Sequence, residues 1–485
     1  MSSSASLIRF DDLLEYRIKV GKYHLLVFLT CCLIYFIDGV DIVCLALTLP
    51  PITKEWNISE TNQSLISSVP FIGGCVGSIL CGWIAYKFGR RKVLLWSLLC
   101  QFLLSFTSAY IDSVISFIVV KFIIGLMIGI MTTIAPLTIS EIMPLRYRGQ
   151  AVILVIFFTS IGKLYACIVA WFALTDLEDQ NWRKMIFWSA APAILGWIGV
   201  YFFTFKSPRY EIVMGRVGEG VAILNQIGQM NDEDFVDFDE RIIEDMRRWQ
   251  MTVFKREEAS SALSLLKGKY SGITFSLSAA HFSMSFIYYG TIFILPEILW
   301  ILFGHTTAEE IDTDLSGNTI AVLGELPSAF TALFIVENKF FGRKNSLFYG
   351  TGGCIVLFLL SSISSASIII FFIAIVRYIM RMMLAIVLLL AIELYPTHCR
   401  AYGVGIFSAM GRLGRCLMPW FCIFLLRFSP KAPLLGFACG CTLVMAAIHG
   451  IPYDTIKRYL DTKGNEVENY IELPNMRNWE EIDSS

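Results

Sequence analysis

The sequence predicts an all-α membrane protein with twelve transmembrane helices, arranged as two pseudo-symmetric bundles of six. Hydrophobic residues make up 56% of the 485-residue chain, which is more than a soluble protein of this length usually buries. Apolar stretches recur at the length of a bilayer crossing, and motifs of the first half of the chain return in the second. These three observations together favour one lipid-embedded body over several soluble domains.

Twelve apolar stretches come close to the roughly 20 residues that a helix needs to cross the hydrocarbon core. A charged linker, 207–270, in which we expect amphipathic helices, separates a first bundle, 24–206, from a second, 271–451. An N-terminal segment, 1–23, and a tail, 452–485, complete the chain. The twelve stretches are 24–48, 64–86, 93–110, 114–140, 150–174, 186–205, 271–303, 318–336, 344–363, 367–393, 401–426 and 432–451.

Positive charge gathers in alternate loops between these stretches. Lys87, Arg90 and Lys92 follow the second stretch, whereas the next loop carries only Asp112. The positive-inside rule then places both termini and the linker in the cytoplasm. This topology suits a plasma membrane or an intracellular vesicle equally, and it puts two glycosylation sequons in the first outer loop. The sequons begin at Asn57 and Asn62.

Two motifs of the first half return in the second at nearly constant spacing. A glycine and two basic residues recur 253 residues later, and a Glu, Pro, Arg set recurs 252 residues later. Duplicated halves of this kind place a substrate site at their interface near the bilayer midplane, with the two bundles rocking against each other. The corresponding residues are Gly89 and Gly342, Arg90 and Arg343, Arg91 and Lys344, Glu141 and Glu393, Pro144 and Pro396, and Arg148 and Arg400.

Both motifs suit a gate on the cytoplasmic side. The glycines allow tight turns, and the basic residues can pair with the glutamates at the ends of the fourth and tenth stretches. Such ion pairs can lock the inner side while the outer side is open. The alternative is that these charges only set the topology. The gate candidates are Gly89, Arg90, Arg91, Glu141, Arg148, Gly342, Arg343, Glu393 and Arg400.

Ionisable and tyrosine side chains within the apolar stretches are the candidates for a substrate or ion site. A charge at mid-bilayer costs about 2.5 kcal/mol or more, so these residues are expected to face the bundle interior or a cavity. Lys121 and Arg415 are further charges to which the sequence assigns no separate role. The candidates are Asp38, Asp41, Lys163, His281, Tyr288, Tyr289, Glu325, Arg377, Arg381 and Arg412.

Specific hypotheses attach to four of these candidates. Asp38 and Asp41 stand three residues apart on one helical face; they can bind a cation, carry a proton, or form a buried pair with a basic residue. Arg412 lies about halfway along its stretch, where it can hold a substrate carboxylate. Its alternative partner is Glu325 or an aspartate of the first stretch. Glu325 precedes Pro327, which can create a hinge, and it is the candidate for proton coupling.

The functional classes differ in their support. A secondary active or facilitative transporter of a small organic solute fits the duplicated gate and the intramembrane charges of both signs. An organic anion or zwitterion, with or without proton coupling, is the favoured solute. An enzyme or an ATP-driven pump is disfavoured, because no phosphate-cradling glycine loop or hydrolase elbow occurs. The net charge of −1 points to no nucleic acid, and the thirteen cysteines lack the spacing of a metal or disulfide framework. We expect a monomer without a cofactor.

These motifs resemble the major facilitator superfamily. Its signature loop, Gly-x-x-x-Asp-Arg/Lys-x-Gly-Arg-Arg, is matched by residues 82–91, with Tyr86 in place of the aspartate. In the second half, residues 337–344 look like the same loop, and Glu337 can stand for its acid as a further gate candidate. The resemblance implies the major facilitator fold and alternating access by a rocker-switch motion.

Within that superfamily the chain is similar to the synaptic vesicle glycoprotein 2 and synaptic vesicle 2-related group, a branch allied to organic-ion and nicotinate transporters. The matching runs are 38–41 (Asp-Gly-Val-Asp), 207–209 (Ser-Pro-Arg) and 288–290 (Tyr-Tyr-Gly). The resemblance implies transport of an organic ion and a vesicle membrane. Because Tyr86 and the two residues before 207 depart from the pattern, the alternative function is a vesicle-membrane binding or trafficking protein with little or no transport.

Overall fold

The computed structural model is helical wherever it describes regular structure, and the described residues contain no strand. Nine of the described helices are long and apolar enough to cross a membrane, and a shorter apolar helical stretch covers Val322–Val336. The described residues are 10–16, 18, 20–173, 181–231, 243–244, 246–248, 250, 265–266, 270–303, 319, 322–336, 338, 341–395, 397–429 and 431–451.

The first half of the chain forms six long helices flanked by three short ones. They are α1 (Phe10–Tyr16), α2 (Lys22–Trp56), α3 (Glu60–Phe88), α4 (Arg90–Ser108), α5 (Val114–Ile142), α6 (Leu145–Ala173), α7 (Trp182–Phe203), α8 (Pro208–Val213) and α9 (Val217–Met230). The long helices follow the predicted stretches with small shifts at their ends. The largest shift is in α2, which continues through Pro50 and Pro51 beyond the predicted end.

The second half repeats this pattern from residue 271 onward. Its helices are α12 (Ser271–Phe303), α14 (Pro327–Val336), α15 (Gly342–Ile363), α16 (Ala366–Leu394), α17 (Thr397–Leu426) and α18 (Ala432–His449). The predicted break before Pro327 is present: Leu326 is a turn, and α14 begins at the proline. Proline cannot donate the backbone hydrogen bond that would continue the preceding helix.

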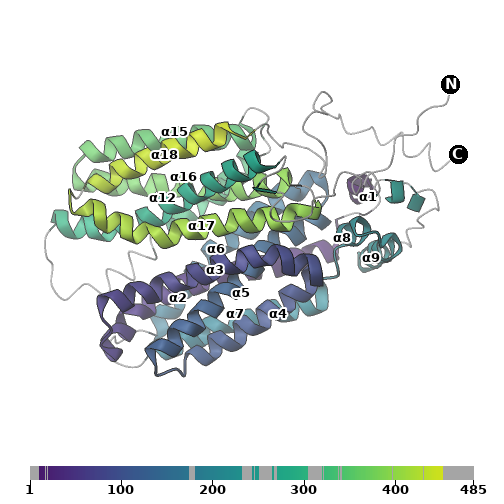
Figure 1. Cartoon of the computed structure of the whole chain (residues 1–485), viewed down its shortest axis with the longest axis horizontal. Coiled ribbons are helices and arrows are strands. Elements are labelled where there is room, and N and C mark those ends of the chain that lie inside the picture. Colours follow the sequence, from purple (N-terminus) through teal and green to yellow (C-terminus); the bar gives the residue numbers. More distant parts are fainter. Residues whose placement is uncertain are drawn as a thin grey trace.

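Each half of the molecule repeats the same pattern of helix contacts (Figure 1). α2 lies against α6 as α12 lies against α17, and α4 lies against α7 as α15 lies against α18. The α2–α6 contact requires glycine, because a Cβ on Gly39 would come within 2.0 Å of the Thr159 carbonyl oxygen. Small residues of this kind let membrane helices approach each other closely.

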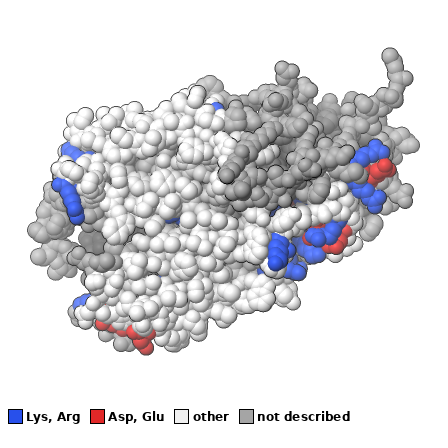
Figure 2. All heavy atoms as spheres, in the orientation of Figure 1, with Lys and Arg blue, Asp and Glu red and all other residues white. Residues whose placement is uncertain are grey.

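Charged side chains on the described surface gather at the two ends of the molecule. On the face shown in Figure 2, blue and red atoms gather at both ends of the helices, and the described surface between them is almost free of charge. Large apolar side chains such as Trp96, Phe172 and Phe334 are exposed, as expected of helices that face lipid. The short helices α1, α8 and α9 lie together at one end (Figure 1), which we call the α8–α9 end.

The two halves meet closely along α3 and α17. A Cβ on Gly82 would lie 2.8 Å from the Cα of Tyr402, and a Cβ on Gly405 would lie 2.4 Å from the Ser78 carbonyl oxygen. Gly82 is near the end of α3 that lies at the α8–α9 end. The interface between the halves is therefore tightly packed along this helix pair on that side.

Candidate substrate cavity and gate

A cavity lies between the two halves at mid-depth. Its walls come from α2, α5 and α6 of the first half and from α12, α16 and α17 of the second. Six of the ten predicted binding residues line it. The polar and aromatic lining residues are Tyr35, Asp38, Thr132, Thr159, His281, Tyr288, Tyr289, Arg381, Ser408, Arg412 and Arg415.

Arg412 is the most buried cation of the cavity wall, with 6% of the residue exposed. Its Nη2 donates a hydrogen bond across the interface to Thr132 Oγ1 at 2.6 Å. Asp38 lines the same cavity from the opposite wall, and no carboxylate of the described residues lies within ion-pair distance of Arg412. The guanidinium therefore retains donors that can serve a ligand.

Two further arginines face the same cavity. Arg381 of α16 donates to the Ile156 carbonyl oxygen at 3.0 Å, which is again a neutral partner from the other half. Arg415, to which the sequence assigned no role, lies 4.8 Å from the centroid of the Tyr289 ring, a cation–π distance. It follows Arg412 by three residues, so the two share a face of α17.

His281 lines the cavity but is held by its own half. Its Nδ1 is 2.8 Å from the Phe407 carbonyl oxygen, and since a carbonyl only accepts, this nitrogen carries the proton. The imidazole also stacks on the Phe407 ring with centroids 4.0 Å apart. This packing supports a structural role for the imidazole more than a role in coupling.

Glu325 lies at the centre of a buried ion cluster that joins the halves. Its carboxylate is 3.1 Å from Lys163 Nζ of α6 and 2.7 Å from Arg377 Nη2 of α16. Lys163 also donates to the hydroxyl of Tyr288 at 2.9 Å. The Ser328 hydroxyl donates to the Glu325 carbonyl oxygen at the helix break, at 2.6 Å. Glu325 is thus committed to two cations, and it is not the partner of Arg412.

Asp41 has separate surroundings from Asp38. Gln101 Nε2 of α4 donates to its carboxylate, and the same amide reaches Ser105 Oγ at 3.1 Å. Lys121 of α5 contributes a nearby positive charge. This cluster lies within the first half and Asp41 is not part of the cavity wall, so the two aspartates do not form one site.

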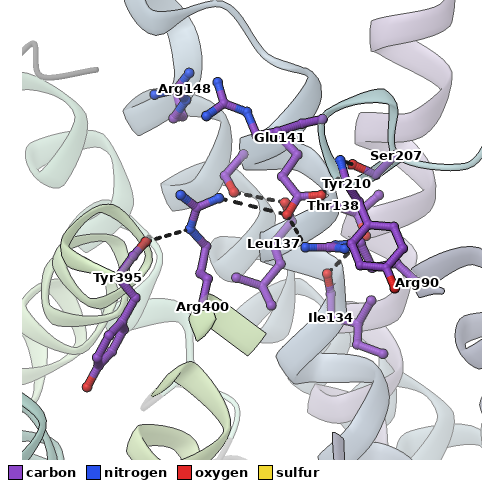
Figure 3. Close-up of polar contacts among 12 residues, drawn as sticks. Arg90, Ile134, Leu137, Thr138, Glu141, Arg148, Ser207, Tyr210, Tyr395 and Arg400 are labelled. Atoms are coloured by element: carbon purple, nitrogen blue, oxygen red, sulfur yellow. Dashed lines mark hydrogen bonds and ion pairs between the residues drawn. The ribbon is translucent and has the colours of Figure 1, made fainter. Parts of the chain in front are cut away.

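A buried cluster around Glu141 lies at the α8–α9 end (Figure 3). Arg90 Nη2 lies 2.5 Å from the Glu141 carboxylate, and the Ser207 hydroxyl donates to its other oxygen at 2.6 Å. Arg400 approaches the same carboxylate from the second half at 3.8 Å, while its Nε donates to the Tyr395 carbonyl oxygen at 3.0 Å. One carboxylate therefore links both halves and the start of the linker.

Tyr210 of α8 completes this cluster. The Arg90 guanidinium lies 4.5 Å from the centroid of its ring, and its hydroxyl donates to the Tyr86 carbonyl oxygen at 2.5 Å. Burial raises the pKa of the Tyr210 phenol, so the hydroxyl stays protonated and able to donate. The backbone of Tyr86, rather than a side-chain acid, thus ties the signature loop to α8.

The duplicated turn is present in the second half with its own ion pair. Arg343 Nε is 2.9 Å from Glu393, matching the pairing of Arg90 with Glu141. Gly89 and Gly342 adopt φ angles of 79° and 59°, in the left-handed region that favours glycine.

Other gate candidates have different surroundings from those expected. Arg91 donates to the Tyr201 carbonyl oxygen at 2.7 Å and so braces α4 against α7. Arg148 pairs at 2.6 Å with Asp11 of α1, which also binds Arg209. The helix α1 was not predicted, because its seven residues are too few for a periodic pattern. Glu337 lies outside the described residues.

The two sequon asparagines lie together at the opposite end of the molecule. Asn57 is exposed at the end of α2, with a φ of 49°, and Asn62 is exposed in the first turn of α3. Both side chains are accessible to a glycosylating enzyme, and whether they are modified stays a prediction.

Comparison with known proteins identifies the class of protein that this fold and cavity define. The sequence pattern of the family described as sugar (and other) transporter matches residues 23–471. The chain belongs to this family of major facilitator transporters. It is therefore a multi-pass integral membrane protein and not an enzyme, and the predicted fold class is confirmed.

Particular relatives define its branch. The chain is 25% identical over 474 residues to the putative transporter SVOPL of Danio rerio, covering 91% of this chain and 88% of that protein. It is 25% identical over 407 residues to the niacin transporter NiaP of Acinetobacter baylyi, covering 83% and 87%. Its structure resembles the E. coli proton:xylose symporter XylE bound to 6-bromo-6-deoxy-D-glucose, with a TM-score of 0.76, 19% identity and coverage of 90% and 98%. The predicted resemblance to the synaptic vesicle 2-related group is confirmed.

Proposed function

We propose that the chain carries a small organic anion across the membrane by alternating access. The observation that supports this proposal is Arg412, a buried guanidinium at the interface of the halves whose described hydrogen-bond partner is the neutral hydroxyl of Thr132. Arginine remains charged in proteins, and a buried charge is costly without a counter-charge. A substrate carboxylate supplies that counter-charge in bidentate geometry, whereas an amine would repel the arginine.

The relatives support an organic acid as the class of substrate. One of them is named as a niacin transporter, and niacin is an aromatic carboxylic acid. The cavity offers Tyr288 and Tyr289 beside its arginines, which can contact a flat ring through their faces. A ligand fits this wall when its acid group contacts Arg412 and its apolar or aromatic body lies against the tyrosines.

The cluster around Glu141 supports the alternating-access part of the proposal. Arg90 and Ser207 contact the carboxylate from the first half and the linker, and Arg400 contacts it from the second half. Rocking the halves apart at this end must separate Arg400 from Glu141. We infer that the described conformation is the one closed at the α8–α9 end, and that this end is cytoplasmic by the positive-inside rule.

Asp41 is the better candidate for proton coupling, although the sequence favoured Glu325. Glu325 is in direct contact with two cations, and protonating it would leave both of them buried without a counter-charge. Asp41 instead accepts from a neutral amide, and no cation of the described residues lies within ion-pair distance of it. Its protonation leaves only Lys121 nearby to be rebalanced.

The alternative function, a vesicle-membrane binding or trafficking protein, was motivated by the missing aspartate at Tyr86. The gate cluster weakens that motivation. The loop is tied to α8 by the Tyr86 carbonyl and the Tyr210 hydroxyl, so its anchoring does not need the acid. Transport is therefore the function that the geometry supports best.

Uptake by purified protein in proteoliposomes tests the proposal. Five solutes are offered in turn, with and without an inward proton gradient: nicotinate, benzoate, a zwitterionic amino acid, a quaternary amine and xylose. We expect an acid to accumulate and the amine and sugar to remain excluded. Arg412→Ala should lower acid uptake by roughly 30-fold or more, the loss expected for a charge-assisted hydrogen bond, while Arg412→Lys retains part of it.

The Arg412 variants also need to be folded for this comparison, which a melting curve in detergent checks. Equal uptake of acid by wild type and Arg412→Ala would remove the arginine from the site. If no solute accumulates under any gradient, the transport proposal fails and the binding or trafficking function takes its place.

A further inference from the structure

The formal charge of the cavity wall is strongly unbalanced. Among the described residues that line it, three are arginines, Arg381, Arg412 and Arg415, and one is an acid, Asp38. With His281 counted as neutral, these side chains carry a formal charge of +2. A single monocarboxylate would leave one positive charge without compensation.

The three arginines form no ion pair with any described residue of the chain. Arg381 and Arg412 donate to neutral oxygens, and Arg415 rests on the Tyr289 ring. None of them lies within 4.0 Å of a carboxylate oxygen of a described residue. Arginine cannot lose its proton to relieve the cost, so the missing negative charge must come from solvent ions or a ligand.

A neighbouring cluster shows buried cations of this chain in direct contact with a protein carboxylate. Behind Tyr288, Lys163 and Arg377 share the carboxylate of Glu325 at 3.1 and 2.7 Å. The cavity arginines have no equivalent acid, although they are from the same helices or adjacent ones. The cavity arginines differ from Lys163 and Arg377 because they face the cavity and contact no carboxylate of a described residue.

We infer that the cavity takes an organic dianion, with a dicarboxylate as the chemical class. This inference rests on the proposed function and narrows its substrate. One acid group contacts Arg412 and Arg415, which share a face of α17, and the other contacts Arg381 of α16. Asp38 lines the opposite wall and repels a third negative charge, so a dianion is preferred to a trianion.

Binding titrations with matched ligand pairs test this inference. The probes are malonate, succinate, glutarate and adipate, each compared with its own monoamide, which has the same length and one charge fewer. Isothermal titration of the purified full chain at pH 7 and low salt measures each Kd. At least one diacid should bind roughly 10-fold or more tightly than its monoamide, the effect of one charge-assisted hydrogen bond.

Charge variants sharpen the test in opposite directions. Arg415→Gln removes one positive charge and should cut the preference for the diacid over its monoamide to roughly one-tenth or less of its wild-type value. Arg415→Lys keeps the charge and should retain most of the preference. Asp38→Asn removes the only acid of the described wall and should increase the preference for higher charge, so that a tricarboxylate such as citrate gains affinity.

The outcomes separate this inference from the function on which it rests. If nicotinate or a monoamide binds as tightly as every diacid, or if Arg415→Gln leaves the preference unchanged, the dianion inference is overturned while anion transport stands. If none of the acids, single or double, binds the folded protein, both proposals fall together.

Discussion

The charged residues of the gate cluster and those of the cavity differ in their partners. At the α8–α9 end, the buried carboxylate of Glu141 is contacted by Arg90, Ser207 and, across the interface, Arg400. At mid-depth, Arg412 and its neighbours face a space between the halves with neutral protein partners only among the described residues. In the proposed mechanism, the paired charges hold a conformation, whereas the unpaired charges bind a ligand. One fold uses the same residue type for both tasks.

Of the substitutions that test this comparison, Glu141→Gln should change stability and labelling the most. The change leaves Arg90 and Arg400 buried beside a neutral amide, and removing one partner of a buried pair costs about 3–5 kcal/mol. We expect a lower free energy of unfolding in denaturant titrations. The α8–α9 end should also open, which increases thiol labelling of Cys399, a residue that is 2% exposed in this conformation. Mass spectrometry identifies the labelled cysteine.

Asp112→Asn is the matched control for that change. Asp112 also pairs with an arginine, Arg183, at 2.8 Å, but its side chain is 82% exposed. Exposed pairs contribute about 0–1 kcal/mol, so this variant should unfold nearly as wild type does. If both variants lose the same stability, or if Cys399 labelling does not change in Glu141→Gln, the gate cluster does not hold the end closed.

The next effect concerns the two carboxylates considered for proton coupling, Glu325 and Asp41. Glu325→Gln leaves Lys163 and Arg377 without their acid and should cost about 3 kcal/mol of stability.

Asp41→Asn keeps a hydrogen bond with Gln101 and should change stability by less than about 1 kcal/mol. It should abolish accumulation driven by a pH gradient while leaving substrate exchange between equal pH values intact. Loss of gradient response in a well-folded Glu325→Gln, with Asp41→Asn unaffected, would reverse the assignment.

A smaller effect should come from the packing of α3 on α17. In Gly405→Ala the new Cβ would lie 2.4 Å from the Ser78 carbonyl oxygen of the other half, so the halves must separate slightly, at about 1–3 kcal/mol. We expect a lower melting temperature and faster labelling of Cys399. Gly352→Ala is the control: its Cβ meets nothing within 4 Å, and replacing a helical glycine in open space should stabilise by about 0.5–1 kcal/mol. Equal behaviour of the two variants would show that the contact between halves is looser than described.

The sequence predicted the helices and the gate better than it predicted the cavity. The twelve stretches and the pairs of Arg90 with Glu141 and Arg343 with Glu393 followed from apolar length and from an internal repeat, both of which are written along the chain. The partners of Glu325 were not predicted, because both are distant in sequence: Lys163 meets it only when the halves associate, and Arg377 only when α16 packs within the second half.

Helix rotation explains the remaining differences. Asp38 and Asp41 share a face in the sense of helical spacing, yet three residues differ by roughly 60° of rotation and 4.5 Å of rise. That difference is enough to turn Asp38 toward the cavity and Asp41 toward Gln101. Neutral partners such as Thr132 were also missed, since a threonine in an apolar stretch gives no distinctive signal. Rotation and register are set by tertiary packing, which a single sequence does not display.

The most direct test of the account is a titration of nicotinate and of a quaternary amine of similar size into purified wild type and Arg412→Ala, at two salt concentrations. We predict that nicotinate binds wild type, that Arg412→Ala weakens this binding by roughly 30-fold or more, and that the amine binds neither protein. Equal nicotinate affinity in the two proteins, or amine binding that Arg412→Ala leaves unchanged, would contradict an anion site built on the unpaired arginines of the cavity.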